Sequence, residues 1–249
     1  MQKMFNKIFV PLTKSGTKDN IAFISQSQLF HIPGKQVYLC ACKFDVNEYS
    51  QELYEQLGIY LPEKIKSASI KRQAEFLAGR YAAAMSLRLL GYECNSIPVG
   101  EHKAPQWPDG VKASISHSDS VAVCLATSTF EYNFVGIDVE SIVSSQVCNQ
   151  IKHQIITETE SVNLSATKIS DECALTIAFS AKEALFKAVY PYVKCYLDFK
   201  SSIIEKLNSS SVALKLALPK GCSCTCIDGE LIHCHYFCYQ KMIITMIIR

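Results

Sequence analysis

Two acidic side chains alternate with apolar ones on a short segment in the middle of the chain. The segment, residues 135–140, reads VGIDVE, and its residue types favour a β-strand. Successive side chains of a strand point to opposite faces, so Asp138 and Glu140 lie side by side, and Gly136 would keep their face open. Two carboxylates this close repel each other unless a cation lies between them, and oxygen ligands of this kind suit Mg²⁺. An ordinary solvated acidic strand face is the alternative explanation.

A third carboxylate lies on a predicted helix, residues 173–190, which Pro191 ends. Apolar residues repeat along it at helical spacing and define a buried face, and Lys182 falls inside that face. Glu183 and Lys187 are four residues apart and share one side of the helix. A Mg²⁺ site with three carboxylates and adjacent lysines suits phosphoryl or phosphodiester chemistry. The alternative is a surface Glu–Lys pair beside a lysine whose ammonium reaches water.

Basic side chains that could hold a polyanion precede the acidic segment. Arg72 and Arg80 are eight residues apart on the first predicted helix and lie on one side of it, where their planar guanidinium groups suit phosphate oxygens. Lys103 lies in a loop that holds three prolines, and His117 ends a short predicted strand, from which its ring could bind a phosphate. Solvated arginines, a loop lysine and a structural histidine explain the same residues one by one.

Predicted helices and strands alternate in an order that places these residues in two comparable halves. We expect an α+β protein with one half at residues 1–128, which holds the basic elements, and the other at 129–249, which holds the carboxylates and the Lys-Glu helix. The expected elements are strands at 36–42, 113–117, 121–126 and 134–140, helices at 65–90 and 173–190, polar helix and loop at 141–172, and strands from Val212 with a hairpin turn at Asp228-Gly229.

The composition of the 249-residue chain excludes several classes of protein. Apolar residues make up 49% of it, which is enough for a sizeable core. Charged residues make up only 19%, and the net charge of +2 argues against a nucleic-acid coat or a polybasic membrane tether. No apolar run approaches the ~20 residues that span a bilayer, and the N-terminus lacks a signal-peptide core, so we expect a cytosolic protein.

The twelve cysteines are expected to be reduced structural thiols, because most stand singly among apolar neighbours. Cys94, Cys124, Cys148 and Cys173 are of this kind. The tail differs, because it gathers the metal-capable residues Cys222, Cys224, Cys226, His233, Cys234, His235 and Cys238. Their spacing is not the paired pattern of common zinc sites and also fits one face of a hairpin strand, so a zinc-binding module in the tail stays an alternative.

Together, these segments resemble the 4′-phosphopantetheinyl transferase superfamily, and within its surfactin-type class the branch of enterobactin synthase component D. The Gly-Ile-Asp-x-Glu strand of the family is found at 136–140 and its Lys-Glu-Ala helix at 180–188. The helix that is specific to the branch matches 71–80, and its Lys-x-Pro, Trp-Pro-x-Gly and Ser-x-Ser-His motifs match 103–105, 107–110 and 114–117. Order and spacing agree over residues 70–200, whereas the first 60 residues and the tail from Ser201 carry no family motif.

The resemblance implies a pseudo-twofold α+β fold whose two similar halves bind coenzyme A between them. Asp138 and Glu140 would hold Mg²⁺, which bridges to the pyrophosphate. Glu183 would be a third ligand, the general base that takes the serine proton, or both. Lys182 and Lys187 would neutralise the phosphates, with Lys187 favoured for the charge on the leaving side.

The resemblance also implies the substrates. Arg72, Arg80, Lys103 and His117 would bind the adenosine 3′-phosphate and its neighbours, with Ser116 a further candidate. The serine of an apo acyl or peptidyl carrier protein attacks the β-phosphate, and adenosine 3′,5′-bisphosphate leaves. The carriers would serve siderophore, nonribosomal peptide, polyketide or polyunsaturated fatty-acid synthesis, and a chain of two halves could act as a monomer. A Mg²⁺-dependent phosphodiesterase or nuclease would use the same carboxylates but needs a broader basic surface.

Overall fold

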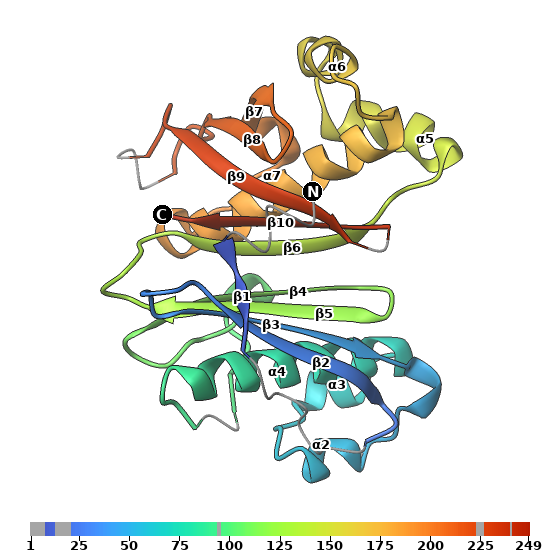
Figure 1. Cartoon of the computed structure of the whole chain (residues 1–249), viewed down its shortest axis with the longest axis vertical. Helices are drawn as coiled ribbons and strands as arrows, with labels where there is room; N and C mark the ends of the chain where they lie inside the picture. Colours follow the sequence, from blue (N-terminus) through green and yellow to red (C-terminus); the bar gives the residue numbers. More distant parts are fainter. Residues whose placement is uncertain (1–7, 13–20, 94–95, 223–226, 240) are drawn as a thin grey trace. The chain divides into compact units, whose positions relative to one another are not determined.

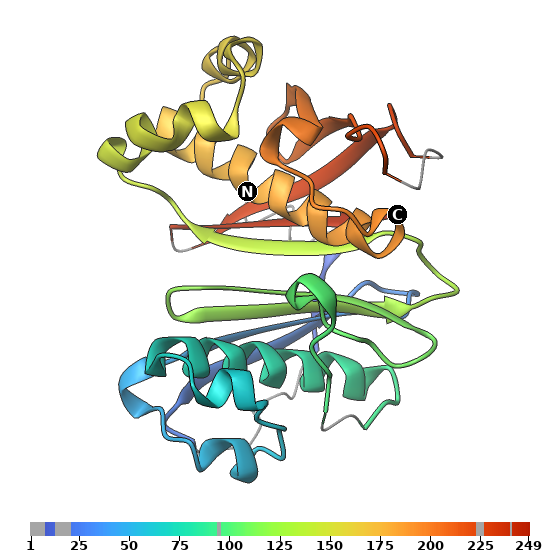
Figure 2. The same ribbon diagram turned by 180° about the vertical axis from the view of Figure 1, so that it is seen from behind.

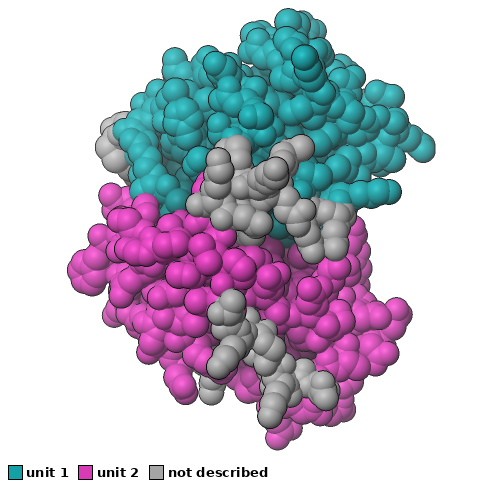
Figure 3. Space-filling model, in the orientation of Figure 1, with its two compact units in different colours: residues 1–6, 134–249 teal, residues 7–133 magenta. Residues whose placement is uncertain are grey.

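The computed structural model describes residues 8–12, 21–93, 96–222, 227–239 and 241–249. The chain divides into two units, Lys7–Asn133 and Phe134–Arg249, which we call the N-terminal and the C-terminal unit (Figure 3). Each holds a five-stranded antiparallel sheet with one long helix packed against it (Figure 1). This confirms the expected α+β fold of two halves. None of the helices among these residues is long and apolar enough to cross a membrane.

The sheet of the N-terminal unit has the strand order β1-β2-β3-β5-β4, and helix α4 covers one of its faces. Its strands are β1 (Val10–Pro11), β2 (Ile24–His31), β3 (Val37–Phe44), β4 (Val111–Ser118) and β5 (Val121–Ser128). Its helical segments are η1 (Val46–Glu48), α2 (Leu53–Gln56), α3 (Glu63–Lys66), α4 (Ile70–Leu89) and η2 (Glu101–Lys103).

The helix expected at 65–90 is interrupted. It consists of α3 and α4, because the Ser69 side chain accepts a hydrogen bond from the Arg72 backbone N–H and starts a new helix there. The expected stop is confirmed: Gly91 follows α4 with a φ of 85°, in the left-handed region that glycine adopts readily.

The sheet of the C-terminal unit has the order β6-β10-β9-β8-β7, and α7 packs against it, as Figure 2 shows from behind. The strands are β6 (Val135–Ser141), β7 (Ser202–Leu207), β8 (Ser211–Leu216), β9 (Leu231–Tyr239) and β10 (Met242–Ile248). The helical segments are α5 (Ser145–Ile155), α6 (Glu158–Ser165), α7 (Asp171–Val193) and η3 (Phe199–Ser201).

Two expectations for the C-terminal unit need correction. Helix α7 does not end before Pro191 but runs on to Val193, because a proline so close to the C-terminus removes a single N–H from the last turn. The hairpin turn at Asp228-Gly229 does not join two strands directly. Gly229 has a φ of 74°, as such a turn requires, but it closes a longer connection between β8 and β9.

The apolar face predicted for the second long helix is confirmed. Leu175, Ala178, Leu185 and Val189 of α7 are all buried, in one cluster with side chains of the sheet such as Ile243. The face of α4 that meets its own sheet is similarly buried and rich in alanine, which allows close packing of helix on strand.

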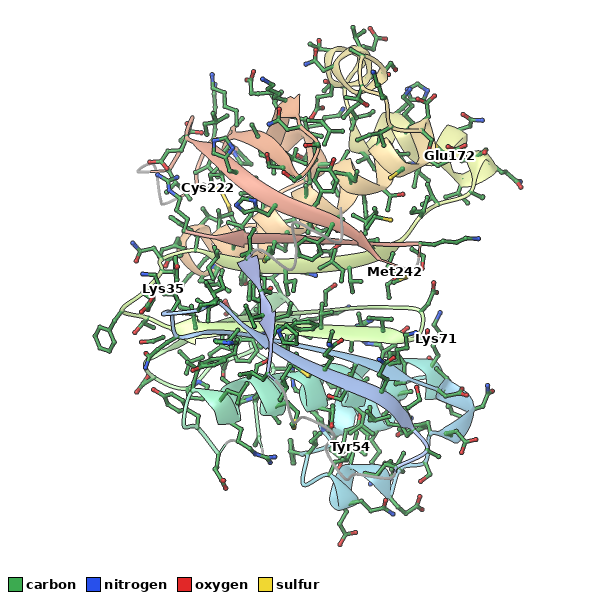
Figure 4. The ribbon with its side chains drawn as sticks, viewed as in Figure 1. Lys35, Tyr54, Lys71, Glu172, Cys222 and Met242 are labelled. Carbon is green, nitrogen blue, oxygen red and sulfur yellow. A yellow bond between two sulfur atoms is a disulfide. The ribbon has the colours of Figure 1, made fainter. Side chains whose placement is uncertain are left out.

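A disulfide joins Cys195, just after α7, to Cys222, in the connection between β8 and β9 (Figure 4). The expectation of reduced thiols is therefore wrong for these two residues, although Cys124, Cys148 and Cys173 are free. Cys94 lies outside the described residues.

Proteolysis of the folded protein without a reductant is expected to release a cross-linked pair of peptides that carry Cys195 and Cys222. Mass spectrometry would identify the pair, and reduction should separate it into its two members. Recovery of both cysteines as alkylated free thiols from protein alkylated before unfolding would contradict the assignment.

Candidate active site

Strand β6 and helix α7 bring three of the predicted site residues together in the C-terminal unit. Asp138 of β6 is 2% exposed, and its Oδ1 accepts a hydrogen bond of 2.7 Å from Nζ of Lys187 on α7. Glu183 lies one helical turn before Lys187 and is half-buried. Burial raises the pKa of Glu183, while the charge of Lys187 lowers it and the charge of Asp138 raises it. All three charged groups therefore act on one another.

Gly136 explains how the helix comes this close to the strand. A Cβ atom at this position would lie 2.0 Å from the carbonyl oxygen of Ala184 and 3.0 Å from Cβ of Ala188. Only glycine therefore permits this approach of α7 to β6. We expected Gly136 to keep the acidic face of the strand open. That interpretation is wrong, because the backbone of the helix fills the space that the missing side chain leaves.

Glu140 occupies the next position on the same face of β6, opposite Ile243 of β10, and is half-buried. Within the described residues, no three metal-binding side chains converge into a ready-made cation site. Instead, the Lys187 ammonium supplies the positive charge at Asp138. The chemistry of the donors still fits Mg²⁺, because Asp138, Glu140 and Glu183 offer only hard carboxylate oxygens.

Lys182 has different surroundings from those we expected. Its ammonium is buried and lies 2.7 Å from Oε1 of Glu160, and it donates to the carbonyl oxygens of Ile155 at 3.0 Å and Phe199 at 2.8 Å. Burial lowers the pKa of Lys182, while the hydrogen bond and the charge of Glu160 raise it. Because these partners match the three donors of an ammonium group, the prediction of a phosphate ligand does not fit this residue, and neither does the surface alternative.

Glu160 is a residue that the sequence analysis missed. One of its oxygens closes a capping box with Thr157 at the start of α6, and the other accepts from both Lys182 and the backbone N–H of Ile204. The Thr-x-x-Glu pattern at 157–160 is a recognisable signal for the cap. No local pattern indicates that the same carboxylate also pairs with a lysine of α7.

In the N-terminal unit, Arg80 is a buried cation. Arg80 is only 7% exposed, and its guanidinium carbon lies 4.5 Å from the ring centre of Phe76. Burial lowers its pKa to about 10, against smaller effects of Cys124 and Tyr54 that raise it. No carboxylate of the described residues forms an ion pair with Arg80, and its Nε has no hydrogen-bond partner among them. A cation in this state favours an anionic ligand.

Arg72 and His117, two of the residues that the resemblance assigns to phosphate binding, contact each other. Arg72 Nη1 lies 2.8 Å from His117 Nε2 and 3.5 Å from Oε2 of Glu75, and His117 Nδ1 lies 3.8 Å from the same oxygen. Because a guanidinium group can only donate, the contact is a hydrogen bond in the tautomer whose Nε2 accepts. The three side chains form one cluster between α4 and β4.

Two further predicted phosphate ligands are not part of this cluster. Lys103 is exposed at the end of η2, where it has a φ of 65°, and it makes no side-chain hydrogen bond or ion pair with another described residue. Ser116 is buried on β4 and, as the neighbour of His117 in a strand, lies on the opposite face of the sheet. The structure thus separates Ser116 from the residue with which it was grouped.

Among the described residues of the tail, the metal-capable side chains do not gather into a site either. Cys222 is bonded to Cys195, and Cys224 and Cys226 lie outside the described residues. On β9, His233 is exposed while Cys234 is fully buried, because the two side chains alternate across the strand. The zinc alternative has therefore lost Cys222 as a free ligand.

Known proteins resemble this chain along most of its length. A model of the 4′-phosphopantetheinyl transferase N-terminal domain matches residues 61–127, and one of the 4′-phosphopantetheinyl transferase superfamily matches residues 134–238. The chain belongs to the 4′-phosphopantetheinyl transferase superfamily. It is therefore a transferase of this group.

Several similar proteins have names that state a function. Enterobactin synthase component D of Escherichia coli (strain K12) is 40% identical over 196 residues, which cover 77% of this chain and 85% of the relative. The protein of the same name from Salmonella typhi is 37% identical over 176 residues, or 70% of each chain. The 4′-phosphopantetheinyl transferase PptT of Mycobacterium tuberculosis is 30% identical over 147 residues, 58% of this chain and 64% of the relative.

The buried ion pair of Lys182 and Glu160 gives a prediction that separates a structural role from phosphate binding. Lys182→Met should lower the free energy of unfolding by about 3–5 kcal/mol, because it leaves the Glu160 carboxylate buried without its cation. The Michaelis constant for coenzyme A should not change. Urea unfolding and steady-state kinetics would measure the two effects.

The double variant Lys182→Met/Glu160→Gln is the control, since it removes the uncompensated charge as well. It should recover part of the lost stability. A stable Lys182→Met protein with a raised Michaelis constant for coenzyme A would show that Lys182 binds phosphate after all.

Proposed function

We propose that this chain transfers 4′-phosphopantetheine from coenzyme A to a serine of an apo acyl or peptidyl carrier protein, in a reaction that requires Mg²⁺. The observation that carries the proposal is the meeting of Asp138, Glu183 and Lys187 where α7 packs on β6, in a chain of this superfamily. We infer a siderophore-type peptidyl carrier as the preferred partner, because the similar relatives are named enterobactin synthase component D. We also propose that one chain is active as a monomer.

Asp138, Glu140 and Glu183 are the residues that would hold Mg²⁺, since each offers carboxylate oxygens and no softer donor. Bound Mg²⁺ supplies positive charge that stabilises the pyrophosphate as negative charge builds on the leaving group. The proposal for Glu183 is supported by its half-buried position one turn before Lys187 and by its electrostatic interaction with Asp138.

In the proposed transfer step, one bond to phosphorus forms as another breaks, and side chains of this chain take up the proton and the charge. The serine oxygen forms a bond to the β-phosphorus of coenzyme A, the bond from that phosphorus to the bridging oxygen breaks, and adenosine 3′,5′-bisphosphate leaves. The serine proton goes to a carboxylate oxygen of Glu183. Lys187 has three N–H donors, one of which is used by Asp138, so it could also donate to a phosphate oxygen on the leaving side.

The basic residues of the N-terminal unit would bind the 3′-phosphate of coenzyme A and its neighbouring phosphates. Arg80 supports this role most directly, because a buried guanidinium group is costly without an anion. Arg72 and His117 would act together, and the exposed Lys103 would add charge. We do not include Lys182 or Ser116, because the first is bonded within the C-terminal unit and the second lies on the other face of β4.

Incubation of the purified protein with Mg²⁺, coenzyme A and an apo carrier domain should convert the carrier to its holo form. Intact-mass spectrometry would show the added phosphopantetheine, and EDTA should prevent it. A siderophore-synthase carrier should react faster than a fatty-acid carrier. If none of several carrier classes gains mass, the proposed activity is wrong.

Asp138→Asn and Glu183→Gln should each lower the rate of transfer by about 100-fold or more, because each removes a charge from the reacting centre. Asp171→Asn is a matched control: it lies on α7 as well but is exposed in the first turn. All three proteins should keep the circular dichroism of the parent. Near-parental turnover of either site variant would mean that the site is assigned to the wrong residues.

A further inference from the structure

Thr245 is a buried polar residue that lies next to the proposed site. It belongs to β10 and pairs directly with Asp138 of β6 across the sheet. In a strand pair, residues in this relation have Cβ atoms about 5 Å apart on the same face. Thr245 is fully buried, so its hydroxyl group requires partners inside the protein.

Two of those partners are on helix α7, and the thiol of Cys234 on β9 is a third. The Thr245 hydroxyl donates to the carbonyl oxygen of Ser180 at 2.8 Å, and the two hydroxyl oxygens of Thr245 and Ser180 also lie 2.8 Å apart. A threonine hydroxyl has one proton, which the carbonyl uses, so the Ser180 hydroxyl is the donor in the second bond. Ser180 is fully buried as well. Two hydrogen bonds in a dry environment thus attach one residue of the helix to one residue of the sheet.

This attachment lies close to the reacting groups along the helix. Ser180 precedes Glu183 by three residues, and Ala184, whose carbonyl oxygen meets Gly136 of β6, follows Ser180 by one turn. The helix is therefore held at two successive turns, to β10 at Ser180 and to β6 at Ala184. These two contacts together limit both the sliding of α7 along the strands and its rotation about its own axis.

We propose that Thr245 is a positioning residue of the transferase: its bonds to Ser180 fix α7 against β10 and so hold Glu183 in place relative to Asp138, the two carboxylates that would share one divalent cation. The inference rests on the proposed function. Thr245 touches neither the substrate nor the cation and acts through α7. Loss of its hydroxyl would leave the close contact at Gly136 as a pivot, and Glu183 could then move relative to Asp138.

A purely structural role predicts a different outcome, and the chain offers a matched control for it. Thr176 lies one turn before Ser180 on α7 and is equally buried. Its hydroxyl donates to the Glu172 carbonyl oxygen at 2.7 Å and accepts from the Val143 N–H at 3.2 Å. Thr176→Val is therefore the same chemical change at another buried threonine, whose hydroxyl bonds α7 to Val143 beyond the end of β6 and not to the residue paired with Asp138.

The test compares Thr245→Val, Thr245→Ser and Thr176→Val with the parent protein. Mn²⁺ serves as the probe, and its binding in the presence of coenzyme A is measured by electron paramagnetic resonance. Thr245→Val should weaken Mn²⁺ binding about tenfold, as loss of a group that orients a ligand commonly does. It should raise the Mg²⁺ concentration for half-maximal transfer and lower kcat, with little change in the Michaelis constant for the carrier. Thr245→Ser keeps the hydroxyl and should restore parental values.

Thr176→Val should lose stability in urea to a similar extent but bind Mn²⁺ as the parent does. Equal Mn²⁺ binding by Thr245→Val and Thr176→Val would overturn the inference. If Thr245→Val does not fold, Ser180→Ala replaces it: the variant loses one of the two bonds and should show a smaller loss of Mn²⁺ affinity, and an unchanged affinity would overturn the inference. A parent protein that modifies no carrier would instead refute the proposed function.

Discussion

The candidate site depends on one close contact, that of the backbone of α7 with strand β6 at Gly136. The carbonyl oxygen of Ala184 occupies the place where any other residue would have a Cβ atom. Because the helix lies this near, Lys187 reaches Asp138 and the charge of Asp138 acts on Glu183. The motif glycine therefore determines how far apart the acidic strand and the Lys-Glu helix are, and with that distance the chemistry available to them.

Buried charge is compensated differently at the two lysines of α7. Lys182 is fully engaged with Glu160 and two backbone carbonyls, and this network joins α6, α7 and the start of β7. Within the part of the chain that the structure describes, the hydrogen bond of Lys187 goes to Asp138, which leaves donors for a ligand. The first arrangement favours a rigid support and the second an exchangeable contact. Arg80, buried among apolar and aromatic groups without an ion pair to a described carboxylate, is a further cation that a polyanion would stabilise.

Patterns of spacing predicted the elements and the side of each element on which the charged residues lie. The strand at 134–140, the buried face of α7 and the meeting of Arg72 with His117 could be expected from alternation, helical period and family motifs. Alternation should also have separated Ser116 from His117. The partner of Lys182 could not be predicted, because it depends on how α6 packs on α7. The same holds for the filled face at Gly136 and for Thr245, whose importance comes from its register opposite Asp138.

Replacement of Gly136 by alanine tests the central claim most directly. The added methyl group would meet a backbone oxygen, so α7 must shift away from β6, and the account predicts a folded protein that has lost Mn²⁺ binding and transfer activity. Gly79→Ala, in the N-terminal unit, is the control. There the new methyl group meets the side chain of Ile115, at 3.1 Å, and no backbone atom of a strand. Parental Mn²⁺ affinity and parental transfer rate in the Gly136→Ala protein would contradict the account.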